Sequence, residues 1–228
     1  MRDQVRFLVS EGRLEFVNGG WVASDEACPT FEEMIMNIMI GHTFLKKTFN
    51  VEVKHAWHVD TFGHSAVTPE LFSRMGFKSI FFSRIDEEDR LNRSLNKALE
   101  FEWRPEYQSG FDIESSNHSI MAHVVSGSYQ APCGLHVFTF ESKREAIETK
   151  FQNKLWDIIA NIKGTVDCLI QYSQSFQTNH VLIPAGMDFA YMFADLNYKF
   201  LADVFQAVGG GASNKQIRLK YSTVDEYI

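Results

Sequence analysis

The stretch VEVKHAWHVDTFGHSAVTPELFSRMGFKSIFFS, residues 51–83, holds two runs of strand-forming residues on either side of a short helical segment. The first run predicts a strand over Val53–Val59. Thr68–Glu70 then predicts the start of a helix, because proline is favoured at the first helical position, and Gly76 predicts its end. The second run, Ser79–Ser83, is apolar nearly throughout, as is typical of a strand covered on both faces of a parallel sheet. The stretch therefore predicts a βαβ unit.

The alternation of strands and helices continues on both sides of this stretch. Thr30 and Glu33 have the spacing of a capping box, which predicts a helix that ends near Lys46. Further strands are predicted at Leu14–Val17, Ser119–Ser126, Val181–Pro184 and Ile217–Tyr221, and further helices from Ser142–Glu145 onward and over Asp195–Val208. The charged segment Arg84–Arg90 is interpreted as a solvated loop. The pattern predicts an α/β fold with a parallel sheet or barrel, in one domain over residues 1–228.

The composition is that of a globular protein. The chain has 228 residues, of which 45% are hydrophobic and 14% aromatic, and its formal net charge is -7. The acidic balance and the absence of a basic cluster argue against nucleic acid as the main partner. Apolar stretches such as Met34–Ile40 are too short to span a bilayer, so no membrane insertion is expected. The N-terminus lacks the pattern of a signal peptide. The oligomeric state is left open.

Three cysteines, Cys28, Cys133 and Cys168, lie far apart and lack the CxxC spacing of zinc ribbons. The spacing therefore argues against a structural zinc site of this kind and against a disulfide framework. It leaves open one disulfide together with one free thiol.

Several reactive side chains follow predicted strands. Trp21, Asp60, Arg84 and Asp188 each come shortly after one. In parallel sheets and α/β barrels the carboxyl ends of strands meet at one edge, and working residues gather there. We therefore expect these side chains to contribute to a site.

His58 and Asp60 are two residues apart on a predicted strand, so both side chains project to the same face, as in an HxD metal-binding pair. Without a third ligand nearby, a packed or hydrogen-bonded histidine is the favoured interpretation of His58. The alternative to a metal ligand for Asp60 is a structural role, in which its carboxylate accepts backbone amides in an Asx turn, as is common for aspartate at strand ends. Gly63 allows the backbone to bend beneath Asp60, and His64 and Ser65 can hydrogen-bond the turn.

Asp60 and Asp188 together suggest two carboxylates that converge from distant strands. Retaining glycoside hydrolysis uses such a pair, about 5–5.5 Å apart, with one carboxylate as nucleophile and the other as acid/base. Trp57, Phe62 and Tyr129 could contact the apolar face of a sugar, although such aromatic residues also fill cores. The sequence contains no GxSxG elbow, no phosphate-binding GxxxxGK[ST] loop and no GxGxxG fingerprint.

Several blocks of the sequence resemble the catalytic domain of the glycoside hydrolase family 38 α-mannosidases, of the lysosomal and Golgi type. The blocks are GRLEFVNGGWV at residues 12–22, DEA at 25–27, AWHVDTFGHS at 56–65 and MGFKSIFFSRID at 75–86. The later run TNHVLIPAGMDFAYMFADLNYKF, residues 178–200, is similar to a further segment of the same family. Their order and spacing agree over most of the chain, and the resemblance is looser from about Arg90 to Lys150.

The resemblance implies a zinc-dependent, retaining α-mannosidase that removes terminal α-mannose from N-glycans, on a seven-stranded β/α barrel of which this chain forms part. It implies that Asp60 is the nucleophile and a zinc ligand, and that Asp188 is the acid/base. Phe62, Arg84 and Tyr129 are expected to line the mannose subsite. Zinc would hold two sugar hydroxyls. The partner is then a mannose-containing glycan, and the location is the secretory pathway, in the lysosome, vacuole or Golgi lumen.

The sequence also departs from the family pattern. Thr61 stands where the family usually has proline, and Gln130 stands where it often has aspartate. The other zinc ligands of the family, an early His-x-Asp pair and a downstream histidine, are not identifiable, so they are expected outside this chain. Two alternatives stay open: a truncated, non-catalytic barrel fragment with weak glycan binding, and a metal-dependent hydrolase similar to polysaccharide deacetylases, which would not require Asp188.

Overall fold

The computed structural model describes residues 2–105, 118–125, 129–135, 143–210 and 217–228. The chain folds into two compact units, the first made of Met1–Ser126 and Ser222–Ile228 and the second of Gly127–Tyr221. Each unit is described by itself. No helix within the described ranges has both the length and the apolar character needed to cross a bilayer.

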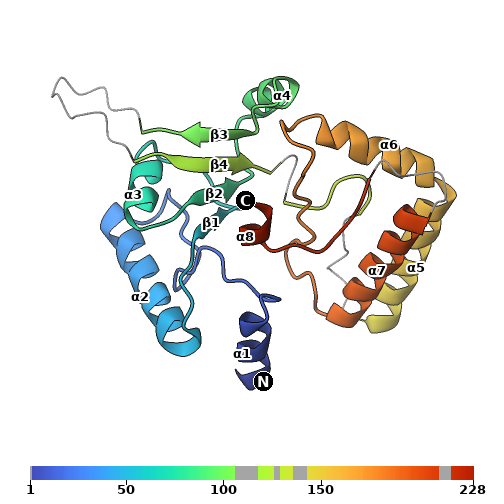
Figure 1. Cartoon of the computed structure of the whole chain (residues 1–228), viewed down its shortest axis with the longest axis horizontal. Coiled ribbons are helices and arrows are strands. Elements are labelled where there is room, and N and C mark those ends of the chain that lie inside the picture. The colour runs from blue at the N-terminus through green and yellow to red at the C-terminus, as the bar shows by residue number, and fades with distance from the viewer. Residues whose placement is uncertain (1, 106–117, 126–128, 136–142, 211–216) are drawn as a thin grey trace. The chain divides into compact units, whose positions relative to one another are not determined.

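The first unit is built on a four-stranded, mostly parallel sheet. Its strands are β1 (His55–His58), β2 (Ser79–Phe82), β3 (Glu100–Trp103) and β4 (Ile120–Val124), in the spatial order β1-β2-β4-β3 (Figure 1). β1 pairs in parallel with β2, β2 pairs in parallel with β4, and β3 is antiparallel to β4. The predicted strands at Val53–Val59 and Ser79–Ser83 are thereby confirmed. The strand predicted at Ser119–Ser126 is confirmed as β4, although Ser126 lies outside the described residues.

The helices of the first unit are α1 (Arg2–Ser10), α2 (Phe31–Phe49), α3 (Thr68–Arg74), α4 (Glu87–Leu95) and the short α8 (Val224–Tyr227). The capping box predicted for α2 is present, because the Thr30 amide donates to Glu33 Oε2 at 2.8 Å and the Glu33 amide donates to Thr30 Oγ1 at 3.4 Å. α3 connects β1 to β2, which confirms the predicted βαβ unit. Ile80, Phe81 and Phe72 are fully buried, so β2 and α3 both contribute to the core.

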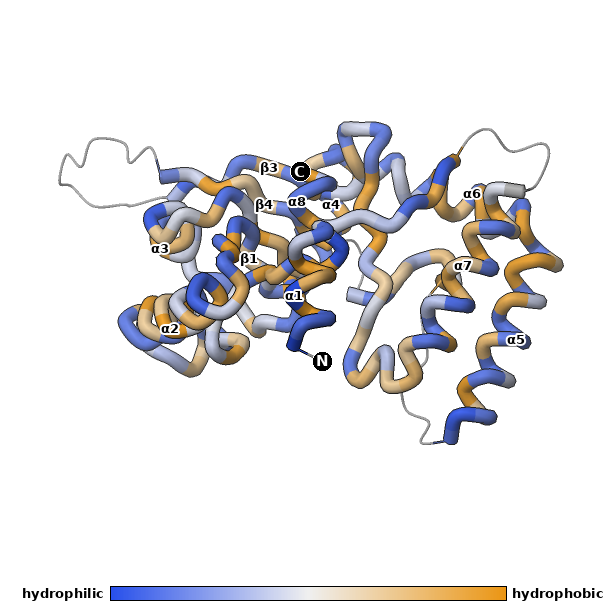
Figure 2. Tube along the Cα trace, turned by 60° about the horizontal axis from the view of Figure 1, so that its bottom comes forward, coloured by the Kyte–Doolittle hydropathy of each residue, from blue (hydrophilic) through white to orange (hydrophobic). Residues whose placement is uncertain are grey.

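The second unit consists of three helices in its described part. They are α5 (Arg144–Ala160), α6 (Ile162–Ser173) and α7 (Ala194–Gly210). Hydrophobic positions recur along α5 and α7 (Figure 2), and the Phe151 and Phe200 rings stack between these helices with centroids 5.0 Å apart. A disulfide joins Cys133 to Cys168, while Cys28 is free and exposed. This is the pair-plus-thiol arrangement that the sequence left open. α5 confirms the helix predicted from Ser142–Glu145 onward, and its N-cap is Lys143, whose side chain makes no capping hydrogen bond. Ser142 lies outside the described residues.

Three predicted strands are wrong. Leu14–Val17 follows α1 without strand pairing, and the Leu14 amide bonds back to the Leu8 carbonyl at 3.1 Å. Val181–Pro184 contains a proline that cannot donate to a ladder, and the Tyr172 hydroxyl donates to the Leu182 carbonyl at 3.3 Å. Ile217–Tyr221 packs its apolar side chains on the helical core instead of joining a sheet.

The loop predicted over Arg84–Arg90 is also wrong, because α4 begins inside it. Asp86 is the N-cap, and its carboxylate accepts the amides of Glu88 and Asp89 at 3.0 and 3.1 Å. Acidic side chains in the first turn are stabilised by the helix dipole, so the run that suggested a solvated loop favours a helix start. β3, α1, α6 and α8 are not predicted from the sequence. With four strands among the described residues, the seven-stranded barrel stays a prediction.

Candidate functional site

Asp60 and Arg84 leave the sheet from neighbouring parallel strands. His58 of β1 pairs with Phe82 of β2, and Asp60 and Arg84 each follow two residues later. Arg84 Nε donates to Asp60 Oδ1 at 3.0 Å and to the Asp60 carbonyl at 3.1 Å, and Nη2 donates to Oδ1 as well. The guanidinium lies over the Phe62 ring, 4.1 Å from its centroid. Three predicted site residues therefore form one cluster at the carboxyl edge of the sheet.

This cluster is open to solvent. The Asp60 side chain is 55% exposed and the Arg84 side chain 42%, and Phe62 is an exposed aromatic residue. Both hydrogen bonds from Arg84 to the Asp60 carboxylate end on Oδ1, so Oδ2 is the oxygen that can approach a substrate or a metal ion. Arg84 thus orients a carboxylate that a bound molecule can reach.

Two adjacent carboxylates hold the backbone of the loop that carries Asp60. The Phe62 amide donates to Asp25 Oδ1 at 3.1 Å, and the Ser65 amide donates to Glu26 Oε2 at 2.6 Å. Gly63 has a φ of 105°, a conformation that favours glycine. The DEA block therefore shapes the FGHS loop, which sequence reasoning did not anticipate, because residues 25–26 and 62–65 are far apart along the chain.

Glu26 also belongs to a cluster with two histidines. One ligand atom from each of Glu26, His58 and His64 lies within 4.8 Å of the other two. His58 Nδ1 is 3.6 Å from Glu26 Oε1, and these two side chains are only 3% and 5% exposed. His58 also packs edge-on against Phe72, with ring centroids 5.1 Å apart. The packed histidine favoured by the sequence thus has a carboxylate and a second imidazole beside it.

Burial and hydrogen bonding shift the pKa values of this cluster in opposite directions. Burial tends to raise the pKa of Glu26, but interaction with His58 and hydrogen bonds from Ser65 and Thr68 outweigh it, so that this pKa lies below its ordinary value. Burial is the main reason why the pKa of His64 also lies below its ordinary value. The cluster therefore combines an ionised carboxylate with a neutral imidazole near pH 7, and these are groups that can bind a metal ion.

The second unit places Asp188 beside Tyr129. The Tyr129 hydroxyl donates to Asp188 Oδ1 at 3.0 Å, and Asp188 is exposed. Val181–Pro184 is not a strand, so Asp188 does not stand at a strand end as predicted, and Trp21 likewise does not follow one. The two residues that the resemblance assigned to acid/base chemistry and to the sugar subsite are nevertheless in contact.

Trp57 has the position of a core residue rather than of a sugar platform. It is half-buried on β1, and its ring stacks on Phe81 with centroids 5.5 Å apart. The idea that Trp57 contacts a sugar therefore gains no support from its packing.

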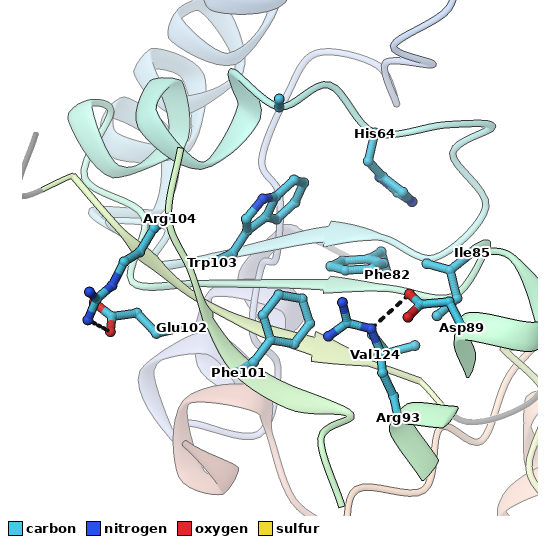
Figure 3. Close-up of a pocket in the computed structure, with 11 residues that line it drawn as sticks. His64, Phe82, Ile85, Asp89, Arg93, Phe101, Glu102, Trp103, Arg104 and Val124 are labelled. Atoms are coloured by element: carbon cyan, nitrogen blue, oxygen red, sulfur yellow. Dashed lines mark hydrogen bonds and ion pairs between the residues drawn. The ribbon is translucent and has the colours of Figure 1, made fainter. Parts of the chain in front are cut away.

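A cavity of about 520 Å³ lies against β2, β3 and β4 in the first unit. Figure 3 shows Phe82, Phe101 and Trp103 around it, with Arg93 reaching Asp89. It is further lined by His64, Ala66, Ile85, Glu102, Arg104 and Val124. Aromatic rings next to charged groups can bind a polar organic molecule. No sequence pattern marked this cavity, because β3 was not predicted.

The comparisons with known proteins agree along the whole chain. Residues 1–228 match the family model described as glycosyl hydrolases family 38 N-terminal domain. The chain is 32% identical over its full length to a lysosomal alpha-mannosidase of Dictyostelium discoideum, and 33% identical over 96% of its length to an alpha-mannosidase of Canavalia ensiformis. It is also 32% identical over its full length to a lysosomal alpha-mannosidase of Felis catus. In each case it covers 22% of the relative's own length.

Proposed function

The chain belongs to glycosyl hydrolase family 38, and from this premise we propose that it forms part of the catalytic domain of a zinc-dependent, retaining α-mannosidase. The observation that carries the proposal is the cluster of Asp60, Arg84 and Phe62 at the carboxyl ends of β1 and β2. The relatives named above are α-mannosidases, so the proposed substrate is a terminal α-mannoside of an N-glycan.

Asp60 is the proposed nucleophile. Its carboxylate attacks the anomeric carbon while the glycosidic bond breaks, and Asp188 in its acid form gives its proton to the departing oxygen. The product of this step is a glycosyl ester on Asp60. The Arg84 guanidinium holds Oδ1 and so orients the carboxylate, and the exposed Phe62 ring offers a face for the C–H groups of the sugar.

The second step restores the enzyme. The Asp188 carboxylate now takes a proton from water, whose oxygen attacks the same carbon, and the bond to Asp60 breaks. Two inversions at one carbon give net retention. The Tyr129 hydroxyl, 3.0 Å from Asp188 Oδ1, fixes the orientation of this carboxyl group in both steps.

Zinc enters the proposal through Asp60. Zn²⁺ is bound by carboxylate oxygens in many proteins. The Asp60 side chain is exposed and has one oxygen that Arg84 does not bind, so Asp60 fits the role of a zinc ligand. When bound, zinc would orient sugar hydroxyls and stabilise developing charge. The other family ligands are expected outside this chain.

We further propose that the four-stranded sheet is part of a seven-stranded β/α barrel, and that residues 1–228 belong to one catalytic domain. The proposed location is the lysosome, the vacuole or the Golgi lumen. The disulfide between Cys133 and Cys168 supports it, because such bonds persist in oxidising compartments. The lysosomal alpha-mannosidases among the relatives support it as well.

The test uses the complete protein and a fluorinated α-mannosyl fluoride, which traps a glycosyl ester. We expect mass spectrometry to find the label on Asp60, and we expect Asp60→Ala to remove both labelling and turnover of an aryl α-mannoside. Asp188→Ala should slow substrates with poor leaving groups far more than activated ones. A label on another residue would overturn the role of Asp60, and full activity of Asp188→Ala on poor leaving groups would overturn the acid/base role.

A further inference from the structure

We propose that Glu26, His58 and His64 form a binding site for one divalent transition metal ion, with Zn²⁺ as the best match. The three side chains come from the segment before α2, the last residue of β1 and the loop after it. This set does not include Asp60. The site is therefore additional to the zinc role proposed for Asp60, and it stands on its own geometry.

The first argument is the burial of atoms that make no hydrogen bond. Glu26 Oε1, His58 Nδ1 and His64 Nδ1 are all inaccessible to solvent and have no hydrogen-bond partner among the described residues. Buried polar atoms in folded proteins are nearly always paired, because each unpaired one keeps its desolvation penalty. His58 Nδ1 and Glu26 Oε1 face each other as an ion pair at 3.6 Å, which is longer than a hydrogen bond. Three such atoms in one cluster, with one from each side chain, point to a shared partner between them.

The second argument is that other hydrogen bonds orient the ligand atoms. His64 Nε2 lies 3.0 Å from the Arg84 carbonyl. A carbonyl can only accept, so Nε2 carries the proton, and in the neutral ring Nδ1 keeps its lone pair. Glu26 Oε2 accepts the Ser65 amide at 2.6 Å and the Thr68 hydroxyl at 2.7 Å, which leaves Oε1 directed to the cluster. Metal ligands in proteins are characteristically fixed by such outer contacts.

The third argument concerns the identity and the access of the ion. Two imidazole nitrogens and one carboxylate oxygen form a borderline donor set, which suits Zn²⁺ and its neighbours better than Mg²⁺ or Ca²⁺. The 3.6 Å between His58 Nδ1 and Glu26 Oε1 is close to the separation of about 3.4 Å between two tetrahedral ligands of Zn²⁺. His64 is also a lining residue of the cavity of about 520 Å³, so one of the three ligands adjoins an open space (Figure 3).

The test is metal binding by the purified 228-residue chain after treatment with a chelator. Calorimetric titration should show that one Zn²⁺ ion binds per chain. When Co²⁺ replaces Zn²⁺, we expect the visible absorption bands of a four- or five-coordinate Co²⁺ site. Glu26→Gln, His58→Gln and His64→Gln should each weaken Zn²⁺ binding by about 100-fold or more, since even outer-contact substitutions cost about 10- to 100-fold. His180→Gln, at an exposed position, should leave the affinity unchanged.

Asp60→Asn separates this site from the proposed catalytic zinc. We expect Asp60→Asn to keep the Zn²⁺ affinity of the chain, whatever happens to glycosidase activity in the complete protein. If Asp60→Asn removes binding while His58→Gln keeps it, the ion belongs to Asp60 and the proposal is overturned. The absence of any stoichiometric binding overturns it too, and leaves Glu26 and His58 as an ion pair without metal.

X-ray absorption spectroscopy of the Zn²⁺-loaded wild-type chain tests the proposal without any variant, so its result does not depend on whether the variants fold. We expect two imidazole ligands and oxygen at bonding distances of about 2.0–2.2 Å. A spectrum without imidazole scattering would overturn the proposal even if every cluster variant were unfolded by circular dichroism. The proposal is supported if the variants of Glu26, His58 and His64 fold as the wild type does and lose Zn²⁺ binding, while the control variants keep it.

Discussion

Arg84 Nε lies 3.0 Å from Asp60 Oδ1, and each residue stands two positions beyond a register pair of adjacent parallel strands. The sheet itself therefore sets this contact, because the pairing of His58 with Phe82 fixes where both chain segments leave the strands. A residue placed by a buried parallel sheet is held more rigidly than one placed by a loop alone. Arg84 is thus the residue best positioned to hold the carboxylate of Asp60.

Replacing this arginine should lower catalysis without unfolding the protein. In the complete protein we expect Arg84→Gln to reduce kcat/KM on an aryl α-mannoside by about 100-fold, the range seen when one preorganised electrostatic contact is removed. The matched control is Arg74→Gln, which removes the exposed Arg74–Glu70 ion pair of α3. Arg74→Gln should leave the steady-state constants unchanged. Equal effects of the two substitutions would contradict a specific role for Arg84.

Tyr129→Phe should separate positioning from binding. The substitution removes only the hydroxyl that donates to Asp188 Oδ1. We expect kcat to fall by about 3- to 10-fold, the loss of about one ordinary hydrogen bond, with a larger fall for substrates with poor leaving groups. Steady-state kinetics with a series of aryl mannosides would measure this dependence. A uniform fall for all leaving groups would argue against an effect through Asp188.

Sequence reasoning could predict the parts of the fold in which local chemistry and tertiary packing agree. The βαβ unit at residues 51–83 was predictable because its strands are apolar and its helix has a clear start. Val181–Pro184 was equally apolar, but no partner strand pairs with it in the described part of the chain, and a strand needs a partner. Asp86 was interpreted as part of a loop because its acidic neighbours suit both a solvated loop and a first helical turn.

The residues of the candidate site likewise fall into those that sequence reasoning could place and those that it could not. Asp60 and Arg84 could be placed because strand ends in a parallel sheet share an edge. Glu26 could not, since its link to His58 and His64 depends on contacts between segments more than thirty residues apart in the sequence. The Glu26 cluster shows that the DEA block, recognisable only as part of a resemblance, has a physical role in fixing the loop.

The disulfide should contribute strongly to the stability of the second unit. Cys133 and Cys168 are separated by 35 residues, and closing a loop of this length stabilises a fold by about 3–4 kcal/mol in the chain-entropy description. Replacing both cysteines by alanine should lower the free energy of unfolding by about that amount, as measured by urea denaturation. Cys28→Ala, at the exposed free thiol, should have no comparable effect. A double variant as stable as the wild type would contradict the pairing.

Glu100 should make the stability of the first unit depend on pH. Its Oε1 lies 2.9 Å from His123 Nδ1 and accepts the Tyr227 hydroxyl at 2.6 Å. Burial tends to raise the pKa of Glu100, but these two contacts outweigh it and hold the pKa below its ordinary value of 4.5. The folded state therefore favours the ionised carboxylate more than the unfolded chain does.

The sign of the effect follows from that direction. The stabilisation is fully present above about pH 4.5, the unfolded value, and it is lost as the pH falls through the lower pKa of the folded state. We expect Glu100→Gln to cost about 1.5–3 kcal/mol at pH 7, the range for hydrogen bonds to charged groups. The difference from the wild type should shrink in urea titrations at successively lower pH. Glu11→Gln, at an exposed position, serves as the control. A difference that grows on acidification would mean that the pKa of Glu100 is raised by folding, and the contacts with His123 and Tyr227 would then not stabilise the charged form.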